Sequence, residues 1–204
     1  AILAPNYPEF AKISCSALFC FAIIAIVFFN GELFTGNNFV MFTGLLDKKA
    51  SIYSTLRVWI YSLLGNALGI IFFAYIFVKS GASLSILKPY LEPIVQAKME
   101  LSPIQVILRG ILCNFSVCLA VFSGIKLKSE FGKALLMFFC VFTFVVAGFE
   151  HIIANIAIFS IAGFSLDSFN LALALNNILW AVTGNIIGGG IFLGGILKFT
   201  SIDG

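Results

Sequence analysis

The sequence predicts an all-α membrane protein built from an inverted repeat that contains two broken helices. Of its 204 residues, 61% are hydrophobic and 10% are charged, too little charge to cover a soluble globule of this size. Five stretches are apolar over the roughly 20 residues that a helix needs to cross the hydrocarbon. Two of them carry or adjoin glycine-flanked polar breaks. We therefore expect one membrane domain over residues 1–204.

The expected spans cover about 9–30, 58–78, 104–124, 134–160 and 177–197, joined by short linkers. Basic residues gather after the first and third spans and at the C-terminus: Lys48, Lys49, Arg57, Lys126, Lys128, Lys133 and Lys198. Because such residues mark the cytoplasmic ends of membrane helices, the chain is expected to start outside and end inside. The basic residues form no patch, which argues against nucleic-acid binding.

The first span ends in a polar segment, Gly31 to Asn38, that contains Glu32 and Thr35. Non-helical backbone at membrane depth is tolerated only where protein buries it or where it lines a water-filled cavity. We therefore expect a re-entrant loop on a transport pathway. The second span follows with Asn66 in a Gly-Asn pair.

The fourth span has a similar break at Gly148, Glu150 and His151, and the fifth span has Asn185 in another Gly-Asn pair. Asn185 follows Glu150 at nearly the spacing by which Asn66 follows Glu32. Because the two units are three spans apart, they cross the membrane in opposite senses, as in transporters and channels. The third span has no counterpart, so we expect six helices in the intact protein, the first of them absent from this chain.

His151 is the only histidine, and polar groups in an apolar span must face protein or water. The repeat predicts that Thr35 and His151 converge at the midplane. Because imidazole titrates near neutral pH, one hypothesis is that His151 donates a proton to a weak anion, which crosses as the neutral acid. The pH profile of flux would then change in His151→Asn. The plainer alternatives are an interhelical hydrogen bond for His151 and helix capping by Thr35.

A membrane enzyme or electron carrier is disfavoured. One histidine excludes haem held between two histidines, and no Cys/His group has metal-ligand spacing, so we expect neither metal nor cofactor. The five cysteines lie in spans without a Cys-x-x-Cys pair and are expected to pack as small apolar residues. A proton-coupled anion carrier remains an alternative, because inverted repeats and broken helices serve carriers and channels alike.

Five motifs, in order along the chain, resemble the formate/nitrite transporter family of pentameric anion channels. They are Glu32-Leu33-Phe34-Thr35, Gly65-Asn66, Arg109-Gly110-Ile111-Leu112-Cys113-Asn114, Gly148-Phe149-Glu150-His151 with Asn155, and Gly184-Asn185. The resemblance implies an aquaporin-like six-helix protomer in a homopentamer, with one anion pore per protomer. It further implies a multi-pass protein among the lipids of a bacterial inner membrane, without enzymatic activity.

Carried over position by position, the resemblance assigns an anion pathway. The loop threonine falls on Thr35, the central histidine on His151, and a lysine that would concentrate anions at the outer mouth on Lys98. The other matches are apolar constrictions (Phe19, Ile23, Leu33 and Phe144) and structural supports of the breaks (Glu32, Asn66, Asn114, Glu150, Asn155 and Asn185). Glu150 is expected to bind backbone amides at its break. The alternative for Lys98 is an ordinary solvated linker charge.

The residues after His151 favour one branch of this family. Formate and nitrite members usually continue with serine and, further on, a proline, whereas this chain has Ile152 and no proline in the helix that follows. This departure, together with Gly36-Asn37-Asn38 in the loop, is closer to the hydrosulfide-channel branch. The expected function is a selective channel for small monovalent anions, with hydrosulfide as the expected ion and formate or nitrite as alternatives.

Overall fold

The computed structural model describes residues 1–200, in which every regular element is a helix. Residues 201–204, the end of the predicted domain, lie outside the described part. Four helical runs are long and apolar enough to cross a membrane. They are α1 (Pro8–Phe28), α3 (Ile52–Ser80), α5 (Pro103–Lys126) and the run of α8 (Leu171–Ile186), η1 (Ile187–Gly194) and α9 (Gly195–Thr200). The prediction of an all-α membrane protein is confirmed.

Three shorter apolar helices, α2 (Phe34–Leu46), α6 (Glu130–Val146) and α7 (Ile152–Ser165), adjoin the two breaks. The expected span 134–160 is therefore two half-helices, α6 and α7, on either side of Gly148. Gly148 has φ +72°, a left-handed conformation that glycine adopts without steric cost, and it ends α6 there. The linker between the second and third spans, for which no helix was predicted, forms α4 (Leu84–Met99).

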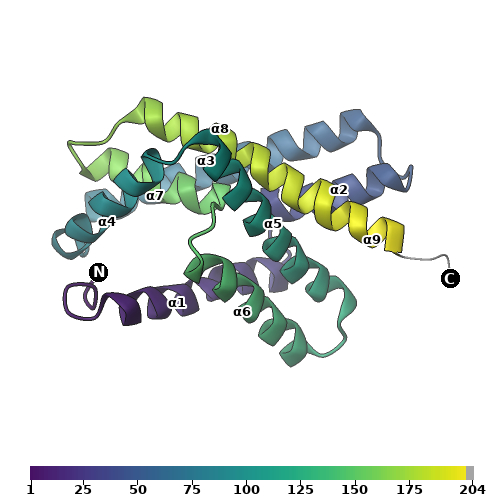
Figure 1. Cartoon of the computed structure of the whole chain (residues 1–204), viewed down its shortest axis with the longest axis horizontal. Helices are drawn as coiled ribbons and strands as arrows, with labels where there is room; N and C mark the ends of the chain where they lie inside the picture. The colour runs from purple at the N-terminus through teal and green to yellow at the C-terminus, as the bar shows by residue number, and fades with distance from the viewer. Residues whose placement is uncertain (201–204) are drawn as a thin grey trace.

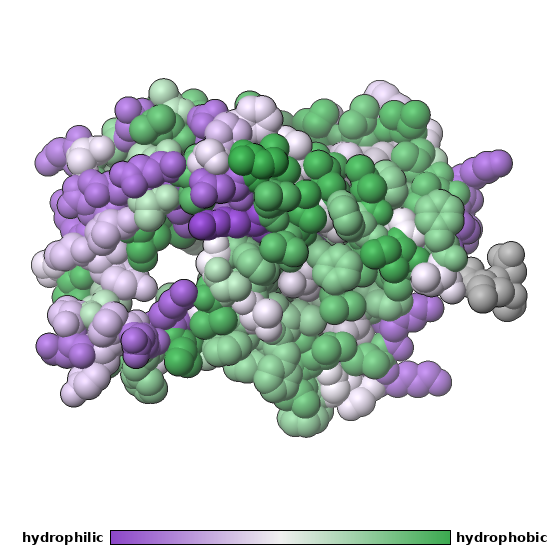
Figure 2. Space-filling view, in the orientation of Figure 1, coloured by the Kyte–Doolittle hydropathy of each residue, from purple (hydrophilic) through white to green (hydrophobic). Residues whose placement is uncertain are grey.

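The helices form a bundle with a hydrophobic middle and two polar ends. The N-terminus and α9 lie at opposite ends in Figure 1, and Figure 2 shows hydrophobic side chains between hydrophilic ones at both ends. At one end, Asp47 after α2 pairs with Lys198 of α9 at 2.5 Å. The hydrogen bond from Lys198 lowers the pKa of the Asp47 carboxyl. The turn between α2 and α3 therefore lies on the same side as α9, as the basic residues predict.

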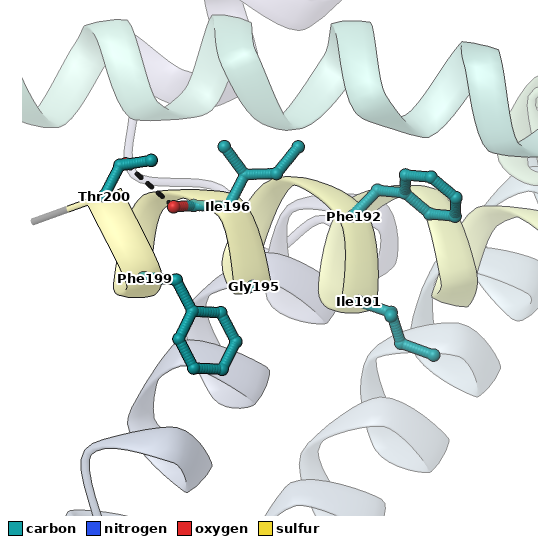
Figure 3. Close-up of a pocket in the computed structure, with 6 residues that line it drawn as sticks. All are labelled: Ile191, Phe192, Gly195, Ile196, Phe199 and Thr200. Atoms are coloured by element: carbon teal, nitrogen blue, oxygen red, sulfur yellow. Dashed lines mark hydrogen bonds between the residues drawn. The ribbon is translucent and has the colours of Figure 1, made fainter.

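The C-terminal run presents an apolar face to its surroundings. A shallow hollow of about 390 Å³ lies along η1 and α9, shown in Figure 3. The Thr200 hydroxyl does not disturb this face, because it donates to the Ile196 carbonyl at 2.8 Å. Such a face suits hydrocarbon, where every polar group needs an internal partner. The hollow is lined by Ile191, Phe192, Gly195, Ile196, Phe199 and Thr200.

Glycines let the backbones of α5 and the C-terminal run meet. A Cβ added at Gly184 would collide with the Ile107 carbonyl, and one added at Gly188 would collide with the Ile111 carbonyl. Small residues one turn apart permit close packing between helices that lipid does not drive together. The contact brings η1, a rare π-helix, against α5 and α2.

Replacing Gly188 with alanine should lower thermal stability. The new Cβ would press on the Ile111 carbonyl, which belongs to the backbone and cannot swing aside like a flexible side chain. Overpacking of this kind typically costs about 1–3 kcal/mol. Gly65→Ala is the matched control, because no atom lies within 4 Å of a Cβ there and alanine favours a helix. Unfolding in detergent micelles tests the pair, and equal melting temperatures for Gly188→Ala and wild type would contradict the packing argument.

The two repeats differ in how closely other helices pack around α5 and around α1. In the second repeat, α5 packs against both α6 and α8. In the first repeat, a groove of about 600 Å³ lies between α1 and the end of α3, lined by residues that include Leu18, Phe19 and Phe77. The side of α1 that faces the end of α3 is therefore open along this groove.

Candidate functional site

The break between α1 and α2 is held by Asn66 of α3. Its Oδ1 accepts from the Phe34 N–H at 2.9 Å, and its Nδ2 donates to the Glu32 carbonyl at 2.9 Å. The Glu32 carboxylate accepts in turn from Asn37 Nδ2 at 2.8 Å. Backbone groups that the break leaves without helical partners are thus satisfied by a neighbouring helix, as irregular backbone at membrane depth requires.

The break between α6 and α7 uses the same kinds of atoms in the same way. Asn185 Oδ1 accepts from the Ile152 N–H at 3.0 Å, and Asn185 Nδ2 donates to the Glu150 carbonyl at 2.8 Å. The Glu150 carboxylate accepts from Asn155 Nδ2 at 2.6 Å. This repetition of hydrogen bonds matches the repetition of the Gly-Asn motifs in the sequence.

Thr35 and His151 meet between the two breaks. Thr35 Oγ1 lies 3.3 Å from His151 Nε2, and the two residues are 0% and 3% exposed. Thr35 lies in the first turn of α2, and His151 is the residue that caps the start of α7. The expected convergence of these two side chains is therefore observed.

Hydrogen bonding fixes which nitrogen of His151 carries the proton. Nδ1 accepts from the Ala154 N–H at 3.1 Å, and a backbone N–H can only donate. In the neutral ring the proton is therefore on Nε2, which donates to Thr35 Oγ1. The hydroxyl proton of Thr35 is left to donate to a third group. The pair thus presents the Thr35 hydroxyl as a donor, and an anion requires a donor.

Apolar side chains enclose this pair. The Phe144 ring stacks on the imidazole, with centroids 5.6 Å apart and planes 17° apart. Phe19 meets Phe144 edge-on, with centroids 6.1 Å apart. Ile23 and Leu33 belong to the same buried cluster as Phe144, and Phe19 packs against it. The four residues expected to form constrictions therefore gather in one apolar cluster next to the imidazole.

Asn114 of α5 ties the two breaks together. Its Nδ2 donates to the Thr35 carbonyl at 3.2 Å and to the Asn185 carbonyl at 2.6 Å. The Cys118 thiol, one turn later on α5, donates to the same Thr35 carbonyl at 3.1 Å. The two carbonyls belong to opposite repeats, so a single side chain links both halves of the site.

Lys98 lies in the last turn of α4 and is ion-paired with Glu150. Its Nζ lies 2.8 Å from Glu150 Oε1 and 3.0 Å from Asn155 Oδ1. The side chains of Lys98 and Glu150 are 16% and 1% exposed. Glu150 therefore binds an ammonium and side-chain amides, instead of the backbone amides expected for it. Lys98 is neither a free cation nor a solvated linker charge.

Asn177 and Cys118 belong to this network but are not among the predicted site residues. Asn177 Nδ2 donates to the Lys98 carbonyl at 3.0 Å, and its Oδ1 accepts from Asn155 Nδ2 at 2.9 Å. Asn177 lies two turns before Asn185 on the same face of α8, a periodicity that could have revealed it. For Cys118 the sequence offers a weaker indication, which is that the residue lies one turn after Asn114 on the same helix.

Discontinuous helices that meet at a buried polar pair inside an apolar bundle define a membrane channel or transporter. The sequence profile described as formate/nitrite transporter matches residues 1–199. The chain belongs to the formate/nitrite transporter family.

Several related proteins are named as transporters. The chain is 36% identical over 188 residues to the uncharacterized transporter YwcJ of Bacillus subtilis, covering 91% of this chain and 73% of YwcJ. It is 30% identical over 193 residues to the nitrite transporter NirC of Salmonella typhimurium, covering 92% and 70%. It is 35% identical to a formate-nitrite transporter of Plasmodium malariae but spans only 63% of that protein.

Two solved structures share the fold at 25% sequence identity. A pentameric formate channel with formate bound has a TM-score of 0.82, with 96% of this chain and 86% of that chain covered. An FNT family ion channel has a TM-score of 0.79, with 98% and 93% covered. These relatives are transporters and channels rather than enzymes.

Proposed function

We propose that the chain forms a selective channel for small monovalent anions, with the Thr35–His151 pair as the central binding position. The carrying observation is the 3.3 Å contact between two buried side chains that offer donors inside an apolar cluster. An ion that enters such a cluster loses water at a cost of several kcal/mol. The Thr35 hydroxyl proton, which the hydrogen bond from His151 Nε2–H leaves free to donate, replaces part of that hydration, while the apolar side chains exclude hydrated ions.

Five protomers assemble around an axis in this proposal, each with its own pathway, in a bacterial inner membrane. The support is the likeness to a pentameric formate channel at a TM-score of 0.82 and the bacterial relatives.

Hydrosulfide is the proposed physiological anion, with formate or nitrite as the alternative. Ile152 after the histidine and the Gly36-Asn37-Asn38 loop support hydrosulfide. The relatives that are a nitrite transporter and a formate channel favour the alternative.

The hydrogen bond from Ala154 supports a neutral His151 that binds the anion without giving up a proton. A second proton on Nδ1 would face the Ala154 N–H, so two donors would oppose each other where a 3.1 Å hydrogen bond now stands. It would also place a positive charge at the N-terminus of α7, the positive end of the helix dipole. A proton-coupled carrier that works through His151 is therefore disfavoured.

The Lys98–Glu150 ion pair supports a positioning role for Lys98. Its ammonium neutralises the carboxylate of Glu150. The backbone of Glu150 forms part of the second break. The negative charge of Glu150 offsets much of the positive charge of Lys98, which weakens the attraction of Lys98 for anions at the mouth. We assign Lys98 to holding the break and not to concentrating anions.

The test is a flux comparison of hydrosulfide, formate, nitrite and chloride through the full-length protein in liposomes, with protein-free liposomes as the control. We expect the three small weak-acid anions to pass faster than chloride, with hydrosulfide fastest. Discrete single-channel openings would support a channel. Saturating, proton-coupled uptake without openings would contradict it, and equal rates for all four anions would refute selectivity.

A further inference from the structure

Asn38 of α2 is a buried amide without a hydrogen-bond partner. It is 0% exposed, and neither its Nδ2 nor its Oδ1 has a partner among residues 1–200. It is the only side chain in that range whose buried polar atoms are left unpaired. An amide offers two donor hydrogens and an acceptor oxygen, and burial without partners is unfavourable for both ends. The anion pathway described above makes no use of this side chain.

Asn38 lies at the seam between α2 and the π-helix η1. The backbone carbonyl oxygen of Asn38 is 3.4 Å from the place that a Cβ would take at Gly190. The side chain of Phe42, one turn later, is 3.3 Å from the same place. A Cβ at Gly194 would likewise lie 3.3 Å from Thr43 Oγ1. Gly190 and Gly194 of η1 thus face α2 here, beside Leu193, which belongs to the same buried cluster as Phe39 of α2. Glycines contribute backbone groups and no side-chain partner for the amide.

The π-helix adds a second reason to expect a ligand at this seam. Over Ile187–Gly194 the helix departs from α geometry, so its hydrogen bonds skip one more residue than those of α8 and α9. A water molecule that inserts into the backbone ladder is one of the recognised causes of a helix irregularity. Buried waters typically bind about three polar groups that would otherwise be unpaired.

We propose that Asn38 binds a buried, ordered water molecule that links α2 to η1. The ligand must be small, and it must both accept and donate, because the amide offers donor hydrogens and the facing glycines Gly190 and Gly194 offer only backbone groups. Water meets these requirements. It accepts from Asn38 Nδ2 and donates to a backbone carbonyl of η1. This site is independent of which anion the channel carries.

Maps of the full-length wild type and of Asn38→Leu, at a resolution that shows other interior waters, test the proposal. We expect density within hydrogen-bond distance of the Asn38 amide in wild type and none at that place in Asn38→Leu. Absence of density in wild type, with other interior waters visible, would overturn the proposal. Density that persists in Asn38→Leu would overturn the assignment to Asn38.

Thermal unfolding gives a second readout. If the water is held, Asn38→Leu removes one of its partners and should lower the melting temperature by at least about 2 °C. Asn38→Ser keeps a smaller polar group that can still bind water, and should fall between Asn38→Leu and wild type. If the seam is dry, leucine replaces an unpaired amide by an apolar group of similar size. An unchanged or higher melting temperature of Asn38→Leu would therefore contradict the proposal.

Discussion

Anion flux through His151→Asn should be roughly 10- to 100-fold slower than through wild type, with the fold intact. Asparagine is a good N-cap, so α7 keeps its start, but its shorter side chain does not place a donor where Nε2–H now meets Thr35. A hydrogen bond to a charged group contributes about 1.5–3 kcal/mol, and each 1.4 kcal/mol corresponds to a factor of ten. Flux into liposomes at fixed protein content measures the effect.

The controls for this variant separate binding, capping and proton transfer. His151→Ala should lose the same flux and, because the cap is gone, about 1 kcal/mol of stability in addition. The pH profile of flux through His151→Asn should keep the shape seen for wild type, because the neutral ring supplies a hydrogen bond and no proton. A profile that changes shape would restore the proton-donation hypothesis. Unchanged flux would show that the Thr35–His151 pair is not the binding position.

Lys98→Met should destabilise the protein by about 3–5 kcal/mol, the usual result of removing one partner from a buried ion pair. Glu150 is 1% exposed and would lose the ammonium that now lies 2.8 Å away. Asn155 and Asn177 cannot replace the charge, because amides carry none. Chemical unfolding of the purified protein in detergent measures the loss.

Two further variants test the cause. Lys98→Met combined with Glu150→Gln should recover most of the lost stability, since no unpaired charge remains in the interior. Lys133→Met breaks the ion pair with Glu130, which is 67% exposed, and should cost less than about 1 kcal/mol. A loss for Lys98→Met no greater than that for Lys133→Met would refute the buried-pair argument.

Much of this architecture follows from the sequence because its determinants are local. Apolar length predicts the membrane helices, and glycine next to polar residues predicts the breaks. Asn66 and Asn185 could be paired from their motifs alone, and the observed hydrogen bonds at both breaks use the same atoms. Thr35 and His151 could be brought together because the repeat fixes their depth in the membrane.

The other features of the fold and site were not predicted, because local sequence patterns do not indicate them. Pro89 and Pro93 lie inside α4, although proline is disfavoured in a helix interior, and the segment was expected to be only a linker. Without α4, the reach of Lys98 to Glu150 could not be deduced, and its charge was assigned to the mouth. The π-helix likewise leaves no local sign, because its glycine run is equally compatible with a close-packed α-helix.

The side-chain amide of Asn114 donates one hydrogen bond to a carbonyl of each repeat. Its Nδ2 lies 3.2 Å from the Thr35 carbonyl oxygen and 2.6 Å from that of Asn185. A hinge at the midplane would have to break one of these bonds in a dry interior, where no solvent could compensate for it. The proposed anion position is therefore expected to stay rigid. We expect any gate of the proposed channel to lie at its mouths.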